Sequence, residues 1–363
     1  MPAQPVPIAL ITNYLAPYRV PLYERLAQRY DLEVLCYGGD ARYVPPWFAD
    51  LDQQLLSAPF PARRLDGVRE VFGLGRRYET IIAPFAGGAI LPAAYQGARR
   101  FILWASVWAQ PRSPGHQLTL PLIRRIYRRA DAVIAYGEHV RRFVASIRGR
   151  DDDVFVAPQA VEADVFGRPV SAEEVSAFRA AHQLGPDPVV LYVGRLDAAK
   201  GIEVLAAAWP RVRTPATLVT IGDGPLVGAV TAAPRTRHLG SLPRSELPVA
   251  YAASGLTVLP SIPTPRFLEP WGLTVNEAMH QARPVVVSDA VGAAAGGLVR
   301  NDETGLVARA GDAGALAGAI DRLLTDQALA TRLGEAGHQA VSTYTYDAMA
   351  EAFDRALAAA GAA

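Results

Sequence analysis

Residues 193–202 carry the strongest chemical signal in the sequence. They read Val-Gly-Arg-Leu-Asp-Ala-Ala-Lys-Gly-Ile, where a short apolar run ends and a helical pattern begins. Gly194 permits a ligand to approach the backbone closely, and Arg195 and Lys200 supply two cations. Gly201 leads into a helix, and a helix N-terminus favours an anion. The segment therefore suits a diphosphate; the alternative is an ordinary turn with two solvated cations.

Lys200 is the only lysine of a chain that otherwise carries 35 arginines. So strong a bias suggests that ordinary surface cations have become Arg. A retained Lys is then expected where a compact ammonium group is needed. Chance retention is the alternative.

Two glutamates frame the start of another expected helix. Glu269 falls in a loop rich in Pro and Gly, and Glu277 falls in the early turns of the helix that follows. Both carboxylates can therefore face one ligand at the helix N-terminus, where carboxylates suit sugar or ribose hydroxyls and the amides suit phosphate. The plainer explanation is that the acidic residues complement the helix dipole.

A glycine-rich turn follows another apolar run, at residues 221–226. It reads Ile-Gly-Asp-Gly-Pro-Leu, and Gly222 and Gly224 would let a ligand lie close to the main chain. With Gly228 it also spells GxGxxxG, which could indicate a dinucleotide site. Pro225 interrupts the start of a phosphate-binding helix, however, and no acidic residue ends a strand about 20 residues later to hold a ribose.

Short apolar runs separated by helical patterns position these motifs. Because the runs lack polar alternation, they predict buried parallel strands with crossover helices. The expected strands are residues 8–12, 32–37, 80–84, 101–104, 132–135 and 154–157, then 189–193, 217–221, 256–259 and 284–288. The expected helices include residues 21–28, 118–129, 202–209, 245–253, 274–281 and 313–324. The pattern predicts two α/β units in tandem, joined near residues 158–187, with a cleft between them.

Residues 188–312 resemble the retaining GT-B glycosyltransferases of the GT4 type, the glycosyl transferases group 1. The resemblance rests on three motifs: the segment at 194–201, the Gly-Asp-Gly-Pro turn at 222–225, and the Glu-x7-Glu spacing of Glu269 and Glu277. Less specific matches lie at 259–261, 284–288 and 301–307. The motifs are specific as a set and cover about the C-terminal half of the chain.

The resemblance implies an α/β protein of GT-B fold, with two Rossmann-like domains facing each other across a cleft. Residues 1–165 would form an N-terminal acceptor-binding domain, and residues 166–340 a C-terminal nucleotide-sugar-binding domain. Residues 341–363 would form a helix, near 346–358, that crosses back to the N-terminal domain.

The resemblance also implies a donor site in the C-terminal domain. Arg195 and Lys200 would contact the diphosphate, Glu277 the ribose hydroxyls and Glu269 the sugar; Arg195, Lys200 and Glu269 would be catalytic. The implied donor-binding residues are Gly194, Arg195, Lys200, Gly222, Gly224, Glu269, Gly272, Leu273, Thr274 and Glu277. No metal is expected, because basic side chains and helix amides take its place. No cofactor is expected either, since the nucleotide-sugar is a substrate.

The N-terminal half matches the family less well. Many relatives carry a glycine pair after the first strand, whereas residues 13–19 read Asn-Tyr-Leu-Ala-Pro-Tyr-Arg. Asn13, Tyr18 and Arg19 would offer hydrogen bonds and an aromatic face to an acceptor, or form only a structural turn. Relatives also often place a His after an N-domain strand, where this chain has none, and His116 is the candidate in its place.

Composition excludes some partners and leaves others open. The 36 basic and 35 acidic residues nearly cancel, so no global basic field indicates a nucleic-acid binder. A lone Cys36 and the lack of any run of about 20 apolar residues predict a cytoplasmic protein. An Arg-rich set on or near N-domain helices is either a solvated face or a peripheral contact with the inner membrane face, which would suit a lipid-linked acceptor. The set comprises Arg124, Arg125, Arg128, Arg129, Arg141 and Arg142.

The expected function is that of a metal-independent hexosyltransferase, as in polysaccharide biosynthesis. It would move a hexosyl unit from an NDP-sugar to a hydroxyl of a glycan, lipid-linked or natural-product acceptor, with retention of configuration. Two alternatives stay open. One is a non-catalytic protein that binds nucleotide-sugars, and the other is an NAD(P)-dependent α/β enzyme built on the Gly222 turn.

Overall fold

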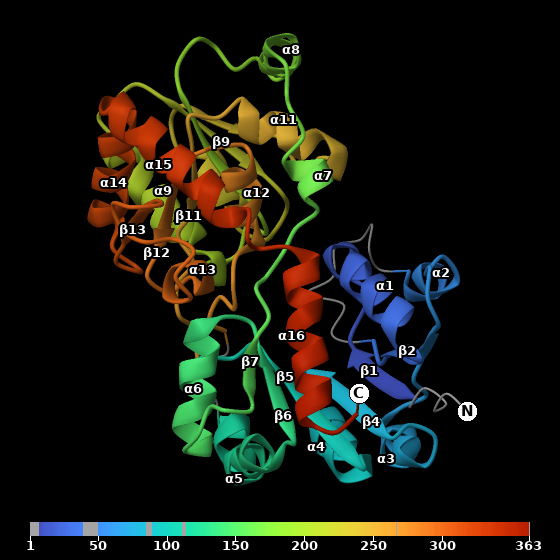
Figure 1. Cartoon of the computed structure of the whole chain (residues 1–363). Coiled ribbons are helices and arrows are strands. Elements are labelled where there is room, and N and C mark those ends of the chain that lie inside the picture. Colours follow the sequence, from blue (N-terminus) through green and yellow to red (C-terminus); the bar gives the residue numbers. More distant parts are fainter. Residues whose placement is uncertain (1–6, 39–49, 85–88, 111–113, 266, 363) are drawn as a thin grey trace. The chain divides into compact units, whose positions relative to one another are not determined.

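The computed structural model describes residues 7–38, 50–84, 89–110, 114–265 and 267–362. The chain forms two compact α/β units (Figure 1). Unit 1 comprises Met1–Gln159 with Tyr346–Ala363, and unit 2 comprises Ala160–Thr345. The first boundary thus falls at Gln159, where residue 165 was expected, and the returning C-terminal segment begins at Tyr346, where residue 341 was expected.

Unit 1 is built on a seven-stranded sheet of parallel strands in the order β3-β2-β1-β4-β5-β6-β7. Its strands are β1 (Ile8–Thr12), β2 (Leu32–Cys36), β3 (Ala62–Arg64), β4 (Thr80–Pro84), β5 (Arg100–Ala105), β6 (Ala132–Ala135) and β7 (Val154–Val156). Its helices are α1 (Val20–Arg29), α2 (Leu51–Leu56), α3 (Val68–Gly73), α4 (Ile90–Gly97), α5 (Pro114–Arg129), α6 (Glu138–Arg148) and α16 (Tyr346–Ala359), with 3-10 turns η1 (Pro17–Arg19) and η4 (Leu74–Arg76).

Unit 2 has a six-stranded parallel sheet in the order β10-β9-β8-β11-β12-β13. Its strands are β8 (Val189–Val193), β9 (Thr217–Ile221), β10 (Thr236–His238), β11 (Leu256–Leu259), β12 (Val285–Ser288) and β13 (Leu306–Ala308). Its helices are α7 (Ala163–Phe166), α8 (Ala172–Ala181), α9 (Ile202–Ala208), α10 (Val227–Thr231), α11 (Leu247–Ala252), α12 (Leu273–His280), α13 (Gly292–Ala295), α14 (Ala313–Thr325) and α15 (Gln327–Val341), with 3-10 turns η5 (Ala198–Lys200), η6 (Trp209–Arg211) and η7 (Arg244–Glu246). Within the described residues, none of the helices of either unit combines the length and the apolar character needed to cross a bilayer.

The expected strands are confirmed, with boundaries that differ by at most one residue. Three strands were not predicted: β3, β10 and β13 each have three residues and lie at or next to charged or turn-rich sequence. All three are edge strands of their sheets. Edge strands are buried on fewer sides than central ones, so their sequences need not form an apolar run.

In each sheet the order in which successive strands are added reverses once, next to the first strand. In unit 2 the chain runs from β8 to β9 and β10 on one side, and β11 to β13 add on the other side of β8. The loops that follow β8 and β11 therefore diverge at the carboxyl ends of two neighbouring strands. Ligands of open α/β sheets bind at such a switch point. These are the two loops that carry Lys200 and Glu269.

The C-terminal helix α16 is part of unit 1, where it packs on α1, β6 and β7 (Figure 1). Phe353 is fully buried and meets Trp104 of β5 edge-to-face, with ring centroids 5.1 Å apart. At the surface, Arg25 pairs with Asp347 at 2.7 Å. The end of the chain thus completes the hydrophobic core of unit 1.

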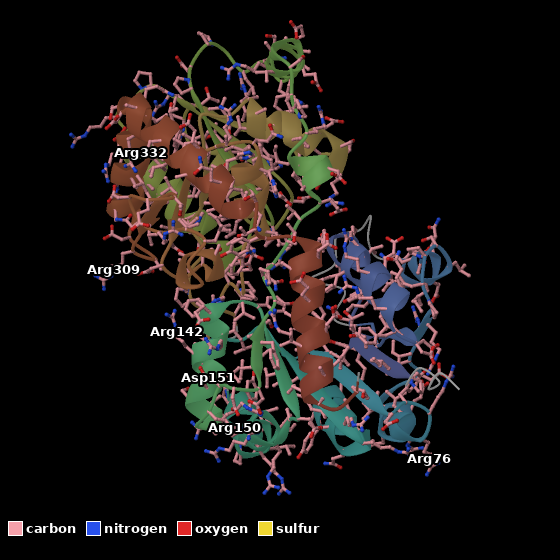
Figure 2. All side chains as sticks on the ribbon, viewed as in Figure 1. Arg76, Arg142, Arg150, Asp151, Arg309 and Arg332 are labelled. Carbon is pink, nitrogen blue, oxygen red and sulfur yellow. The ribbon has the colours of Figure 1, made fainter. Side chains whose placement is uncertain are left out.

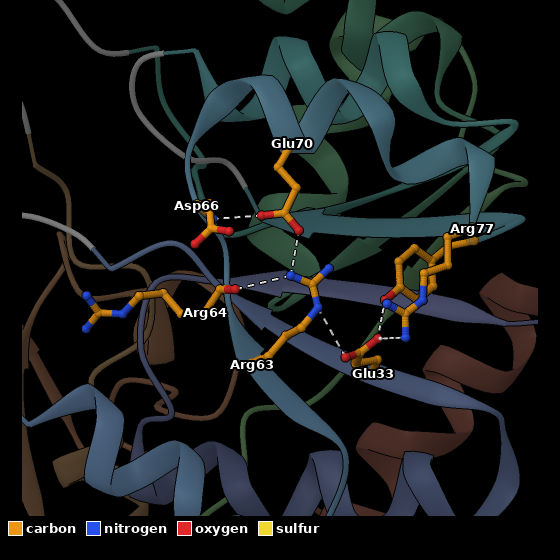
Figure 3. A network of polar contacts seen from close by, with 7 residues as sticks. Glu33, Arg63, Arg64, Asp66, Glu70 and Arg77 are labelled. Atoms are coloured by element: carbon orange, nitrogen blue, oxygen red, sulfur yellow. Dashed lines mark hydrogen bonds and ion pairs between the residues drawn. The ribbon is translucent and has the colours of Figure 1, made fainter.

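A network of charges holds the edge strand β3 in place (Figure 3). Glu33 on β2 forms ion pairs with Arg63 on β3 and with Arg77, both at 3.2 Å. Arg63 also pairs with Glu70 of α3 at 2.5 Å, and Glu70 accepts a hydrogen bond from the Asp66 amide at 2.7 Å. The network joins β2, β3 and α3, which explains how a strand with two arginines is kept in the sheet.

Candidate functional site

The loop after β8 holds both expected cations in a defined conformation. Asp197 caps η5 by accepting a hydrogen bond from the Lys200 amide at 3.0 Å, and its other oxygen pairs with Arg195 at 2.9 Å. The Tyr192 hydroxyl donates to the carbonyl oxygen of Arg195 at 2.6 Å. Gly194, the first residue after the strand, begins this loop. The two cations are therefore presented at the carboxyl end of β8.

Gly201 fixes the β8 loop against the β11 loop. Its φ is +73°, in the left-handed region, and a Cβ there would lie 1.9 Å from the carbonyl oxygen of Pro260. The Ile262 amide also donates to the carbonyl oxygen of Ala199 at 3.0 Å. Only glycine fits both the conformation and the contact, so the sequence signal at Gly201 has a structural cause.

We expect Gly201→Ala to destabilise unit 2 by about 3 kcal/mol, from left-handed strain and overpacking combined. Gly228→Ala is the matched control, because Gly228 lies in α10 and a Cβ there would meet nothing within 4 Å. It should leave stability unchanged or raise it, since Ala favours a helix over Gly. Calorimetric unfolding of both variants checks the difference, and equal stability would contradict the packing described here.

Lys200 and Glu269 form an ion pair between the two switch-point loops. Lys200 Nζ lies 2.5 Å from Glu269 Oε2, and the side chains are only 18% and 6% exposed. Ser261 Oγ donates to the same carboxylate oxygen at 3.0 Å. The Phe267 ring centroid lies 5.7 Å from the ammonium. A nearly buried cation thus lies at the carboxyl ends of β8 and β11.

Glu277 has a different set of partners. Tyr251 of α11 donates a hydrogen bond to Glu277 Oε2 at 2.6 Å. Burial raises the pKa of the Glu277 carboxyl to about 7; the Tyr251 hydrogen bond and the charge of Arg244 oppose this rise, and the charge of Glu162 adds to it. Arg244 itself forms a two-pronged ion pair with Glu162. The carboxyl is therefore poised to change its charge near neutral pH.

The start of α12 offers backbone amides beside Glu269. Gly272 precedes the helix with a φ of +95° and supplies no side-chain cap, and Leu273 and Thr274 are the first helical residues. Trp271 Nε1 donates to Asn276 Oδ1 at 2.8 Å, which anchors the preceding loop to the helix. Amides at a helix N-terminus carry partial positive charge and favour an anion.

The glycines of the 221–226 turn pack on the β8 loop. A Cβ on Gly222, whose φ is +126°, would lie 2.0 Å from the carbonyl oxygen of Gly194. The Leu196 amide donates to the carbonyl oxygen of Asp223 at 2.8 Å, in the same turn as Gly224. The short α10 follows Pro225. Close packing of two loops therefore explains these glycines without a bound ligand.

The structure groups the predicted donor residues in unit 2, at the carboxyl ends of β8, β9 and β11 and at the start of α12. Glu269 and Glu277 were expected to face one ligand, and here they have separate partners, Lys200 and Tyr251. Sequence reasoning assigned no role to five contributing residues, which are Glu162, Asp197, Arg244, Tyr251 and Ser261. The pairing of Glu162 with Arg244 spans 82 positions, so no local pattern could have revealed it.

The residues of unit 1 that were expected to contact the acceptor differ in what the structure describes of them. Asn13 is exposed and accepts a hydrogen bond from the Tyr14 amide at 2.9 Å, and Tyr18 is 40% exposed. His116 belongs to α5, and its side chain lies outside the described residues. No group of three or more His, Cys, Asp or Glu suited to a metal occurs in the portions of the chain described in either unit.

Arg19 does not lie where a residue that contacts an acceptor was expected, at an exposed surface. It is buried, donates to Gln159 Oε1 at 2.7 Å, and lies over the Trp104 ring at 4.8 Å and the Tyr136 ring at 5.0 Å. Aromatic faces stabilise a buried cation. The side chain therefore serves the core of unit 1, and the structure corrects the expectation that it is presented to a ligand.

Comparison with known proteins shows which family part of unit 2 resembles. Residues 187–326 match the family model described as "Glycosyl transferases group 1". The chain is 28% identical over 284 residues to the GDP-mannose-dependent alpha-(1-6)-phosphatidylinositol monomannoside mannosyltransferase of Mycobacterium tuberculosis, covering 72% of each chain. It is also 33% identical over 167 residues to the alpha-D-kanosaminyltransferase of Streptomyces kanamyceticus, covering 43% of this chain and 42% of the relative.

A solved structure supports the same conclusion for the fold. HepE of Anabaena, in complex with UDP, matches with a TM-score of 0.79 at 19% identity, covering 97% of this chain and all of that one. The two Rossmann-like units are those of the GT-B fold. The segment at residues 187–326, which carries the cationic β8 loop and the two glutamates, is similar to the glycosyl transferases group 1.

Proposed function

We propose that the chain is a retaining hexosyltransferase that moves a hexosyl unit from an NDP-sugar to a hydroxyl group. The observation that carries the proposal is the Lys200–Glu269 pair at the switch point of unit 2, next to the N-terminus of α12. An ammonium that is 18% exposed, with helix amides nearby, suits the diphosphate of a donor. The match of residues 187–326 to the glycosyl transferases group 1 supports the proposed donor class, an activated sugar.

The donor contacts follow from the positions of the charged groups. Arg195 and Lys200 would bind the diphosphate together with the amides of Leu273 and Thr274. Glu277 would accept hydrogen bonds from the ribose hydroxyls, in the manner that a carboxylate holds a ribose in dinucleotide sites. Glu269, released from Lys200 by the incoming diphosphate, would accept hydrogen bonds from the sugar.

The proposed reaction is front-face substitution at the anomeric carbon. The bond from that carbon to the diphosphate oxygen breaks, a bond to the acceptor oxygen forms on the same face, and the acceptor proton passes to the leaving phosphate. Lys200 and Arg195 stabilise the negative charge that develops on the leaving group. Because these cations perform the task that a divalent metal performs elsewhere, transfer should proceed without one.

The acceptor is proposed as a hydroxyl on a glycan, a lipid-linked sugar or a natural product. The names of two relatives support this range: one is a mannosyltransferase for phosphatidylinositol monomannoside and the other transfers a kanosaminyl group. In unit 1, Asn13 and Tyr18 are exposed after β1 and are the proposed acceptor contacts.

Calorimetric titration of the full chain with UDP, GDP, ADP and TDP in EDTA tests the donor site. We expect one nucleotide to bind tightly without metal and Glu269→Gln to retain most of that affinity, because Glu269 is assigned to the sugar. The preferred NDP-sugar should then be hydrolysed or transferred in EDTA, with proton NMR showing the anomeric configuration retained.

The other outcomes separate the alternatives. Nucleotide binding with no hydrolysis or transfer from any donor would make the chain a non-catalytic nucleotide-sugar binder. Binding of NAD or NADP, with none of the four nucleotides bound, would favour a dinucleotide enzyme built on the Gly222 turn. Either result would overturn the transferase proposal.

A further inference from the structure

Helix α5 exposes leucine side chains to solvent. In the part of the chain that the structure describes, the strongly exposed large hydrophobic side chains all lie in unit 1, and two of them are on this helix. Leu118 is 85% exposed and Leu122 is 37% exposed. One exposed leucine is ordinary, but two at i and i+4 form an apolar surface on one face of a helix.

The same face of α5 carries arginines. Arg125 and Arg129 follow Leu118 at the i+7 and i+11 positions, so the four side chains form one stripe on a helix. Both arginines are exposed. Tyr127 is buried in the core of unit 1 on the opposite side of the helix, and Ile126 is buried at the flank of the stripe. The stripe Leu118, Leu122, Arg125 and Arg129 is called the α5 stripe below.

The positive charge of α5 is not balanced on the helix itself, because its 16 residues include no Asp or Glu. Two further arginines of α5 contact neutral groups: Arg124 donates to Gln110 at 3.3 Å, and Arg128 donates to the carbonyl oxygen of Ile147 at 3.0 Å. Among the described residues, these contacts bring no acidic side chain to either charge. The helix therefore has a local positive field in a chain of nearly zero net charge.

The neighbouring helix α6 differs from α5 because arginines on it and just after it have acidic partners. Arg141 pairs with Glu138 at 3.2 Å and with Asp151 at 2.7 Å, and Arg150 pairs with Asp153 at 2.7 Å. Figure 2 shows Arg142, Arg150 and Asp151 at the surface beside α6. Acidic partners thus compensate Arg141, so it does not belong with the α5 arginines in one field.

We propose that the α5 stripe docks unit 1 on an anionic lipid surface, with the leucines in the headgroup and acyl boundary and the arginines on lipid phosphates. Charge complementarity favours this occupant, and the stems of arginines can lie along an apolar surface while their charged groups reach lipid phosphates. A second copy of the chain fits less well, because α5 has no acidic residue to pair with the arginines of another α5. The proposal goes beyond glycosyl transfer and rests on unit 1 alone.

Co-sedimentation of the full chain with vesicles tests the proposal. Vesicles of phosphatidylcholine and phosphatidylglycerol in equal parts should bind the chain, whereas pure phosphatidylcholine should bind it weakly. Each arginine near an anionic surface is worth about fivefold in the partition coefficient, so Arg125→Gln with Arg129→Gln should lower binding about 25-fold. Leu118→Ser should lower it about tenfold through lost apolar burial. High salt should weaken the wild-type binding.

Two control variants in unit 1 are matched to these changes. Arg76→Gln with Arg99→Gln removes two exposed arginines outside α5, and Leu56→Ser removes a leucine that is 89% exposed on α2. Both should bind vesicles like the wild type. Nucleotide titration should be unchanged in every variant, so a failed donor site and a failed membrane contact give different results.

The proposal is overturned if the chain binds neither vesicle, or both equally. It is also overturned if the control variants lose as much binding as the α5 variants. Sedimentation velocity adds a third outcome: if Leu118→Ser converts a dimer to a monomer, the stripe is covered by a second copy of the chain.

Discussion

Replacing Lys200 with methionine is expected to lower kcat/KM for the donor about 10²- to 10³-fold, the loss typical of removing one preorganised group that stabilises developing charge. Methionine keeps the apolar stem and removes the ammonium. The effect is large because Lys200 is mostly buried, at 18% exposure. A charge in such a place acts on the leaving diphosphate with little screening by water. Initial rates of donor hydrolysis measure the loss without knowledge of the acceptor.

The same substitution should also destabilise unit 2, because it leaves Glu269 without its cation. That side chain is 6% exposed, and removing one partner of a buried pair costs about 3–5 kcal/mol. Loss of activity could then reflect unfolding. The double variant Lys200→Met with Glu269→Gln separates the two effects, since it removes the isolated charge and leaves Ser261 a hydrogen-bond partner.

We expect the double variant to melt at a higher temperature than Lys200→Met and to be as inactive. Lys200→Arg should also remain impaired, because a planar guanidinium does not replace a compact ammonium between Glu269 and the Phe267 ring. A folded Lys200→Met variant with more than a tenth of the wild-type rate would remove Lys200 from the catalytic site.

The sequence predicted the central strands and the placement of the motif residues at their ends, for a physical reason. Strands such as β8 and β11 are buried on both faces, so their apolar runs are continuous and their ends are marked by glycine or proline. The motif residues follow those ends directly. A topology of parallel strands then brings the two loops together at the switch point, although Lys200 and Glu269 are 69 positions apart.

Sequence reasoning was weaker where tertiary contacts decide a residue's environment. Arg19 looked like a loop cation after β1, yet it is buried between aromatic rings and Gln159, which lies 140 positions away. Arg244 was assigned no role from the sequence, yet it pairs with Glu162 and acts on the pKa of Glu277. Neither environment has a local signature, because the partners come from distant parts of the chain.

Glu277 is expected to make donor binding depend on pH near neutrality. Its pKa is about 7, and a carboxylate accepts hydrogen bonds from ribose hydroxyls best when it is ionised. Affinity for the NDP-sugar should therefore rise about tenfold between pH 6 and pH 8, as expected for a group that must lose one proton on binding. The NDP-sugar suits this titration because its diphosphate does not change charge in that range.

The stability of the free protein should change in the opposite direction. A carboxyl whose folded pKa lies above its usual value contributes stability that is present in full below the usual value and lost as pH rises through 7. Between pH 5 and pH 8, the melting temperature of the wild type should therefore fall relative to Glu277→Gln. Burial of His280 lowers its pKa to about 4, which is below this window.

Substitutions around Glu277 should move the midpoint in opposite directions. Arg244 lowers the pKa of Glu277 and Glu162 raises it, so Arg244→Gln should shift the affinity profile to higher pH and Glu162→Gln to lower pH. Glu277→Gln should bind weakly at pH 8 and show no pH dependence. If this variant binds NDP-sugar as the wild type does, or if the wild-type profile is flat from pH 6 to pH 8, Glu277 does not hold the ribose. The Tyr251–Glu277 hydrogen bond would then be only a structural link between α11 and α12.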